Sequence, residues 1–127
     1  MNMTTTTRQV GLVTIVDISG RIVLGEECIS LGKLVSDLLD KGHNKILVNL
    51  ADVHRVDTAG LAYIVSGLTS VRKRKGDLKL LNPTKDLRGV LEITRLLTVF
   101  DIKDDEVAAV RSFTESPAQQ PERNYSH

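Results

Sequence analysis

The hydrophobic residues of this chain fall into two kinds of run. Short aliphatic or β-branched runs of strand length lie at residues 10–18, 46–50 and 78–81, and such runs are typical of strands packed in a sheet. Between them, apolar residues recur at spacings of three and four, which places them on one face of a helix. Helices between strands imply crossover connections, so the pattern predicts an α/β fold with at least partly parallel strand pairing.

The first third of the chain predicts a hairpin followed by a helix. A strand is expected from Val10 to Ile18, with Gly11 as a break at which the chain can turn. Residues 19–21 interrupt the pattern, and residues 22–24 form a second short apolar run. A helix is then expected over residues 25–42, with acidic residues at its start and a lysine and a glycine at its end. Its apolar stripe consists of Leu31, Leu34, Val35, Leu38 and Leu39.

The sequence after residue 42 predicts two further strands, a short edge strand and three helices. A helix follows the strand at 46–50, with a stripe from Leu61 to Val71 that ends in the basic run 72–75. Thr84 is expected to cap a third helix, and Val99–Phe100 to form the edge strand. A last helix is expected over 104–113. The side chains expected to point inward from these last two helices are Leu87, Val90 and Leu91, and then Val107, Val110 and Phe113.

A chain of 127 residues has room for one domain. We expect that domain to cover residues 1–113. Residues 114–127 contain two prolines and otherwise mainly polar side chains, so they have too little apolar surface to offset the entropy of ordering, and we expect a disordered tail there.

Charge and composition narrow the range of partners. The chain holds 17 basic and 16 acidic residues for a net charge of +1, and its aromatic content is 3% with no Trp. This balance argues against a nucleic-acid-binding protein, because such proteins carry a basic excess and often stack bases on aromatic rings. The basic run 72–75 is explained by its place at a helix C-terminus.

Cofactor and membrane sites are not indicated. Cys28 is the single cysteine, and His43, His54 and His127 are too scattered to form a metal site. The apolar runs are far shorter than the roughly 20 residues of a membrane span, and the N-terminus does not resemble a secretory signal. We therefore expect a cytoplasmic protein without a metal or cofactor.

The stretch from Asn49 to Leu61 offers the most specific chemistry. A predicted strand ends here, and Asp57-Thr58 stands where the next helix begins. One interpretation is a plain helix cap, in which Asp57 or Thr58 accepts a backbone hydrogen bond. The other is an exposed Thr58 hydroxyl at a helix N-terminus, where the helix dipole and free N–H groups would stabilise a phosphate. Gly60 permits the first turn to approach a neighbouring strand or a ligand closely.

The segment Val56-Asp57-Thr58-Ala59-Gly60-Leu61 resembles the Asp-Ser-Ser-Gly-Leu loop of STAS domains, specifically that of bacterial anti-sigma-factor antagonists. Similar segments of that family correspond to residues 20–22, 45–50, 76–80 and 96–100, so the resemblance extends over about residues 8–113. It implies a single α/β STAS (SpoIIAA-like) domain, with a mixed β-sheet and helices packed mainly on one side.

The resemblance also implies a partner-switching role. In this family the unphosphorylated antagonist binds an anti-sigma factor, which is a serine/threonine protein kinase, and so releases a sigma factor. The kinase phosphorylates the hydroxyl residue after the loop aspartate, which is Thr58 here, and a phosphatase restores the active form. Thr58 replaces the usual Ser, and Ala59 replaces a second hydroxyl residue. A threonine in this loop is also similar to the STAS subunit of a bacterial lipid-transport ATPase complex, which binds its partner without a phosphorylation cycle.

We expect the partner to contact the loop 54–59 and the first turns of the following helix. Tyr63 is one of four aromatic residues and lies off the apolar stripe of its helix, so it is either an interface anchor or a residue at the edge of the core. His54 and Arg55 either contact the partner or are a solvated pair. We do not expect an enzyme, because no His or Lys is identifiably placed as a base for Thr58. The partner-binding residues expected are His54, Asp57, Thr58, Ala59, Gly60, Ala62 and Tyr63.

Overall fold

The chain folds around one five-stranded sheet, seen in a computed structural model that describes residues 3–114. The strand order is β1-β2-β3-β4-β5, with β1 antiparallel to β2 and all other neighbours parallel. The strands are β1 (Met3–Val10), β2 (Val13–Ile22), β3 (Lys45–Val56), β4 (Asp77–Leu81) and β5 (Ile102–Lys103). The helices are α1 (Glu26–Asp40), α2 (Thr58–Lys73), α3 (Lys85–Ile93) and α4 (Glu106–Ser112), with a short 3-10 turn at Leu96–Thr98.

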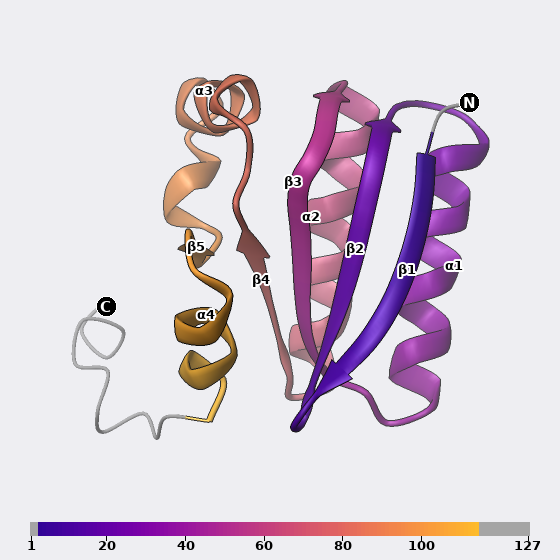
Figure 1. The fold of residues 1–127 in the computed structure, drawn as a ribbon. Coiled ribbons are helices and arrows are strands. Elements are labelled where there is room, and N and C mark those ends of the chain that lie inside the picture. The colour runs from indigo at the N-terminus through magenta and orange to yellow at the C-terminus, as the bar shows by residue number, and fades with distance from the viewer. Residues whose placement is uncertain (1–2, 115–127) are drawn as a thin grey trace.

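The helices lie mainly on one side of the sheet, as Figure 1 shows for α1 and α2. Buried residues of α1, α2 and α3 join one apolar core with alternate residues of β2, β3 and β4. The intervening residues Val13, Ile15, Leu47 and Leu81 face the other way and form a smaller core with Ala109 of α4. The expected α/β fold, a mixed sheet with helices mainly on one side, is therefore confirmed.

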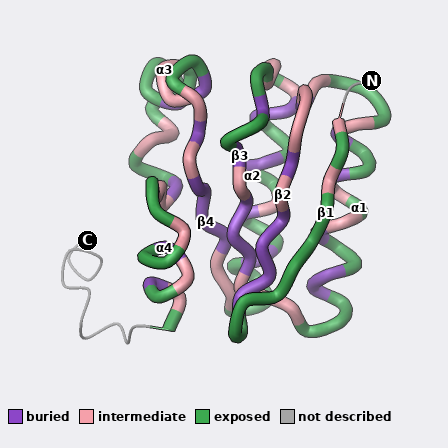
Figure 2. The backbone as a smooth tube through the Cα atoms, viewed as in Figure 1, coloured by how far each residue is buried: buried purple, intermediate pink, exposed green. Residues whose placement is uncertain are grey.

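The N-terminal strand lies earlier in the chain than the sequence pattern predicted. Gly11 does form the hairpin turn, with a φ of +61°, but the threonine run before it is itself a strand. This strand, β1, is an edge strand that is exposed along most of its length (Figure 2). Four consecutive threonines have no alternation of apolar and polar residues, so their preference for strands, which comes from β-branching, was not visible in the hydrophobic pattern.

The predicted interruption at residues 19–21 was also wrong. Strand β2 continues to Ile22, and its register with β3 shifts between Asp17 and Ser19 and again between Gly20 and Arg21. Gly20 takes a φ of +99°, a conformation that favours glycine. The irregularity bends the strand without ending it, as β-bulges do.

Strand β3 is much longer than the predicted strand 46–50. Its pairing with β4 ends at Asn49 opposite Leu81, while its pairing with β2 continues to Val56. The second half of β3 therefore has a neighbour on one side only. Because such a segment is largely exposed, it carries polar residues, and the pattern was misinterpreted as a loop.

The C-terminal part of the fold requires three corrections. Val90 and Val107, expected to point inward, are 37% and 64% exposed. The edge strand lies at Ile102–Lys103, because Val99–Phe100 follow the 3-10 turn Leu96–Thr98 instead. Phe100 is nevertheless buried in the main core. Short segments with few apolar residues do not define their own orientation, and packing against α3 and β4 decides it.

Polar contacts hold α4 against its face of the sheet. Arg8 of β1 binds Asp17 of β2 through Nε at 2.6 Å and Glu106 of α4 through a terminal guanidinium nitrogen at 2.7 Å. Its hydrogen bonds are the largest cause of the lowered pKa of each carboxyl group. Lys79 of β4 is buried, and its Nζ lies 2.7 Å from the Ser112 Oγ and 3.1 Å from an oxygen of Asp101. The short helix α4 is thus attached by charged groups in addition to its small apolar core.

The predicted tail at 114–127 lies outside the described residues except for Thr114. Within residues 3–114, no helix is long and apolar enough to cross a membrane.

Two glycines provide a matched test of the close backbone contact between the turn that follows α2 and the residue before β3. A Cβ added at Gly76 would lie 1.9 Å from the Asn44 carbonyl oxygen, whereas one added at Gly89 of α3 would meet nothing within 4 Å. We expect Gly76→Ala to lower the free energy of unfolding by about 2–3 kcal/mol, because backbone must move to admit the methyl group. Gly89→Ala should raise it by about 0.5–1 kcal/mol through helix propensity. Urea unfolding measures both, and equal effects would contradict this account.

Candidate functional site

Strand β3 leads into helix α2 through a single residue, Asp57. Asp57 is extended, with φ −91° and ψ −178°, and is the N-cap of α2. The expected loop 54–59 is therefore wrong: residues 54–56 belong to β3, and Thr58 and Ala59 belong to the first turn of α2. Because both neighbours of Asp57 lie in regular structure, the backbone of Thr58 has a fixed position.

The Asp57 carboxylate holds together two segments that are distant in the sequence. Its Oδ1 accepts the Gly60 N–H at 2.8 Å, which is the helix cap, and its Oδ2 accepts the Leu24 N–H at 3.0 Å, in the turn before α1. The hydrogen bond from Leu24 and then that from Gly60 hold the pKa of Asp57 below its usual value of 3.8. Asp57 is therefore ionised at neutral pH, and with both oxygens engaged it is a weak base for activating the Thr58 hydroxyl.

Gly60 brings the first turn of α2 against the end of β2. A Cβ at Gly60 would lie 2.0 Å from the Ile22 carbonyl oxygen, which no side chain can accommodate without a backbone shift. The same carbonyl accepts the Asp57 N–H at 3.3 Å. Of the two roles that the sequence left open for Gly60, the structure supports close contact with a neighbouring strand.

Thr58 occupies the first helical position and is exposed. Ala62 follows one turn later, also exposed, and residues four apart share a helix face. Ala59 is half-buried and packs against the main core, and Gly60 is buried. Of the expected partner-binding residues, Thr58 and Ala62 therefore form an accessible strip, while Ala59 and Gly60 support it from below.

His54 lies at the exposed end of β3. Together with Arg55 it lines a shallow depression of about 250 Å³, whose other wall is the N-terminal turn of α3 with Thr84 and Asp86. The Thr84 Oγ1 accepts the Leu87 N–H, which confirms the predicted cap. The sequence analysis did not bring α3 to the site. The two segments are almost thirty residues apart and meet only because β3 extends past β4.

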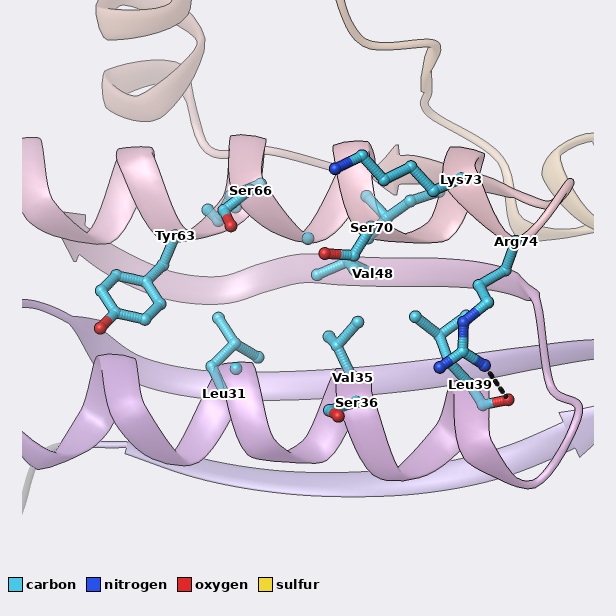
Figure 3. A pocket seen from close by; sticks show the side chains of 14 residues that line it. Leu31, Val35, Ser36, Leu39, Val48, Tyr63, Ser66, Ser70, Lys73 and Arg74 are labelled. Atoms are coloured by element: carbon cyan, nitrogen blue, oxygen red, sulfur yellow. Dashed lines mark hydrogen bonds between the residues drawn. The ribbon is translucent and has the colours of Figure 1, made fainter.

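Tyr63 is 38% exposed and turns toward α1 instead of standing beside Thr58. A Cβ at Gly32 of α1 would lie 3.5 Å from its ring. Figure 3 shows the ring at one end of the space between the two helices. One side of the Tyr63 ring thus packs on α1, as expected of a residue at the edge of the core, and the rest is open to solvent.

The turn before α1 is a second part of the site that the sequence pattern did not indicate. The Cys28 Sγ donates to the Val23 carbonyl at 3.1 Å, and burial raises the pKa of this thiol, with smaller contributions from Asp57 and Glu27. Leu24, held through its N–H by Asp57, is 74% exposed. The available signal was Gly25, whose φ of +127° allows the sharp change of direction after an apolar run.

The site thus consists of a rigid helix N-terminus at which the exposed Thr58 hydroxyl lies next to the Asp57 carboxylate, which is held by two hydrogen bonds. Residues 4–109 match the STAS domain family. Because the match covers most of the chain, the chain belongs to the STAS-domain family.

Its relatives include two proteins that carry the name of candidate anti-sigma factor antagonists. The chain is 40% identical over 68 residues to one from Thermotoga neapolitana, a match covering 54% of this chain and 60% of that protein. It is 32% identical over 78 residues to one from Thermotoga maritima, covering 59% of this chain and 69% of that protein. The chain therefore matches less than two thirds of the length of the first of these relatives.

Solved structures agree with this placement. A crystal structure of a candidate anti-sigma factor antagonist from Thermotoga maritima superposes with a TM-score of 0.79 at 28% identity, covering 87% of this chain and 95% of that chain. The phosphorylated form of SpoIIAA from Bacillus superposes with a TM-score of 0.69 at 16% identity, covering 86% and 98%. At that identity, the second likeness concerns the fold alone, which is SpoIIAA-like.

The lowered pKa of Asp57 predicts a pH-dependent contribution to stability. The ionised carboxylate stabilises the folded state fully above the usual pKa of 3.8, and this stabilisation is lost as the pH falls through the lower folded value. Asp57→Asn can keep the cap to Gly60 but loses the charge. The difference in unfolding free energy between the wild type and this variant should therefore shrink on acidification. Chemical denaturation across the pH range tests this.

As a control for that measurement, Thr69→Val removes a hydroxyl of α2 and no titratable group, so its effect should not depend on pH. A constant difference between the wild type and Asp57→Asn would show that the Asp57 charge does not contribute.

Proposed function

We propose that this protein is an anti-sigma-factor antagonist, which binds an anti-sigma factor kinase through the N-terminal end of α2 and so releases a sigma factor. The observation that carries the proposal is the exposed Thr58 at the first position of a helix whose cap, Asp57, is held from two sides. The names of the two Thermotoga relatives support it. The contact surface comprises His54, Asp57, Thr58, Ala59, Gly60, Ala62 and Tyr63. Of these, the half-buried Ala59 and the buried Gly60 act by supporting the others.

The regulation we propose is phosphorylation of Thr58 by the bound kinase. A phosphate adds about −1.5 to −2 charges at neutral pH. At this position it lies at the N-terminal, positive end of the α2 dipole, which favours an anion. It also lies next to the ionised Asp57. The surface therefore gains a concentrated negative charge while the backbone is held in place, and a partner that docks there meets like charge or an uncompensated desolvation cost.

The extra methyl group of threonine distinguishes this site from one with serine. It restricts rotation about χ1, so the hydroxyl is presented in fewer orientations to a kinase. Because the next residue, Ala59, has no hydroxyl group, Thr58 is the phosphate acceptor that we assign in this turn. We further propose that a phosphatase removes the phosphate, that the protein itself catalyses no reaction, and that it acts in the cytoplasm.

The first test is phosphate transfer. Incubation of the full chain with the cognate anti-sigma factor kinase and ATP should add one phosphate, located at Thr58 by mass spectrometry. Thr58→Ala should abolish it, and the matched variant Thr69→Ala, which alters another exposed threonine of α2, should not. Absence of phosphate, or phosphate that persists in Thr58→Ala, would overturn the assignment.

The second test is the effect of charge on binding. Thr58→Glu should weaken binding to the kinase by about 1–3 kcal/mol, because a carboxylate reproduces part of the like charge and desolvation at the contact. Isothermal titration calorimetry measures the change, with Thr69→Glu as the control of equal charge placed three turns further along α2. Equal affinities of the wild type and Thr58→Glu would argue for the other function considered, a STAS subunit that binds a transporter ATPase without a phosphorylation cycle.

A further inference from the structure

A groove opens between α1 and α2, beside the exposed Thr58 strip, and Tyr63 of the proposed contact surface stands at one end of it. It encloses about 300 Å³. Its floor is apolar and comes from both helices and from the sheet, and its rim is polar. Figure 3 shows Leu31 and Val35 of α1 facing Ser66 and Ser70 of α2 across this space. An apolar floor with a few polar groups at the mouth is the usual composition of a small-molecule site.

The groove exists because small residues occupy positions where the helices face each other. Gly67 lies on the wall formed by α2, and a Cβ there would be 3.7 Å from Leu78 and 4.0 Å from Val35. A larger side chain at this position would therefore fill the space and close the helix pair. Gly32 leaves room for the Tyr63 ring in the same way. The floor residues are already well packed against the sheet, so the groove is preformed.

Two cationic side chains, those of Lys73 and Arg74, line the C-terminal end of the groove, and they differ in whether an acidic group pairs with them. The Arg74 guanidinium donates to Asp40 at 3.1 Å and to the Leu39 carbonyl at 3.2 Å, so its charge is already paired. Lys73, by contrast, has no acidic partner among residues 3–114. Figure 3 shows its side chain running back along α2, as helical side chains lean toward the N-terminus. Lys73 and Ser70 both line the groove at this end of α2.

We propose that this groove binds a single-chain aliphatic carboxylate of medium length, such as a fatty acid. The hydrocarbon chain lies on the floor of Leu31, Val35 and Leu78, and the carboxylate accepts hydrogen bonds from the Lys73 ammonium and the Ser70 hydroxyl. Ten residues of helix separate Tyr63 from Lys73, a length of about 15 Å. One unpaired cation matches one negative charge better than it matches the several charges of a nucleotide.

The proposal does not depend on the proposed function, because its ligand is a small molecule and binding is measured without the kinase. Of the residues that line the groove, Tyr63 also belongs to the proposed contact surface. The test is a titration of the full ¹⁵N-labelled chain with sodium decanoate, kept below the concentration at which it forms micelles. Saturable shifts are expected for the amides of Gly32, Gly67 and Ser70, and calorimetry should give one site. Shifts that do not saturate, or that spread equally over α3, would show detergent-like contact and overturn the proposal.

Two variants separate the role of the charge from that of the floor. Lys73→Gln should weaken decanoate binding roughly tenfold, the value of one charge-assisted hydrogen bond, and leave binding of the uncharged decanol unchanged. Lys85→Gln, an exposed lysine of α3, is the matched control and should have no effect. Equal effects of the two lysine substitutions would overturn the assignment of the carboxylate to Lys73.

Gly67→Leu should abolish binding of both decanoate and decanol, because the new side chain fills the groove. Circular dichroism and a thermal melt establish whether this variant is folded. If it is unfolded, the comparison of Lys73→Gln with Lys85→Gln, each titrated with decanoate and with decanol, still decides the proposal. A folded Gly67→Leu that binds decanoate as the wild type does would overturn it.

Discussion

The contact on which this structure most depends is between the first turn of α2 and the last residue of β2. Gly60 lies so close to the Ile22 carbonyl that any side chain would collide with it, and the Asp57 N–H donates to the same oxygen. Because backbone meets backbone there, the start of α2 is located by the sheet and not by flexible side chains. Asp57 then ties the Leu24 turn to this point through its second oxygen. The exposed position of Thr58 is a consequence of these contacts.

This arrangement suits a switch based on charge more than one based on movement. A phosphate on Thr58 would stand on a helix start held by the sheet, by the cap of Gly60 and by the turn at Leu24, so its direct effect would be on the electrostatic field that a partner meets. The same helix presents a second, different face to α1, where Tyr63 marks the end of the groove. Helix α2 thus contributes both to a surface proposed for a protein partner and to a groove proposed for a small ligand, and Tyr63 lies where the two meet.

The success of sequence reasoning differed between elements for identifiable reasons. The stripes of α1 and α2 were predicted well, because a long helix repeats its apolar face several times and ends in recognisable caps. The threonine strand β1 and the second half of β3 were missed, since both are exposed strands whose residues lack apolar alternation. At the site, the sequence identified Asp57, Thr58 and Gly60, although it placed residues 54–59 in a loop that does not exist.

The amino-acid sequence by itself determined the alternation of strands and helices, the cap at Asp57 and the family resemblance, because each depends on residues close together in the chain. Only the tertiary structure decided that Gly60 faces β2, that Leu24 donates to Asp57 and that α3 adjoins His54. It also decided that a groove remains between α1 and α2. These features join segments that are brought together by parallel crossovers. No local sequence pattern specifies which carbonyl group or which small residue of a distant segment a given residue will contact.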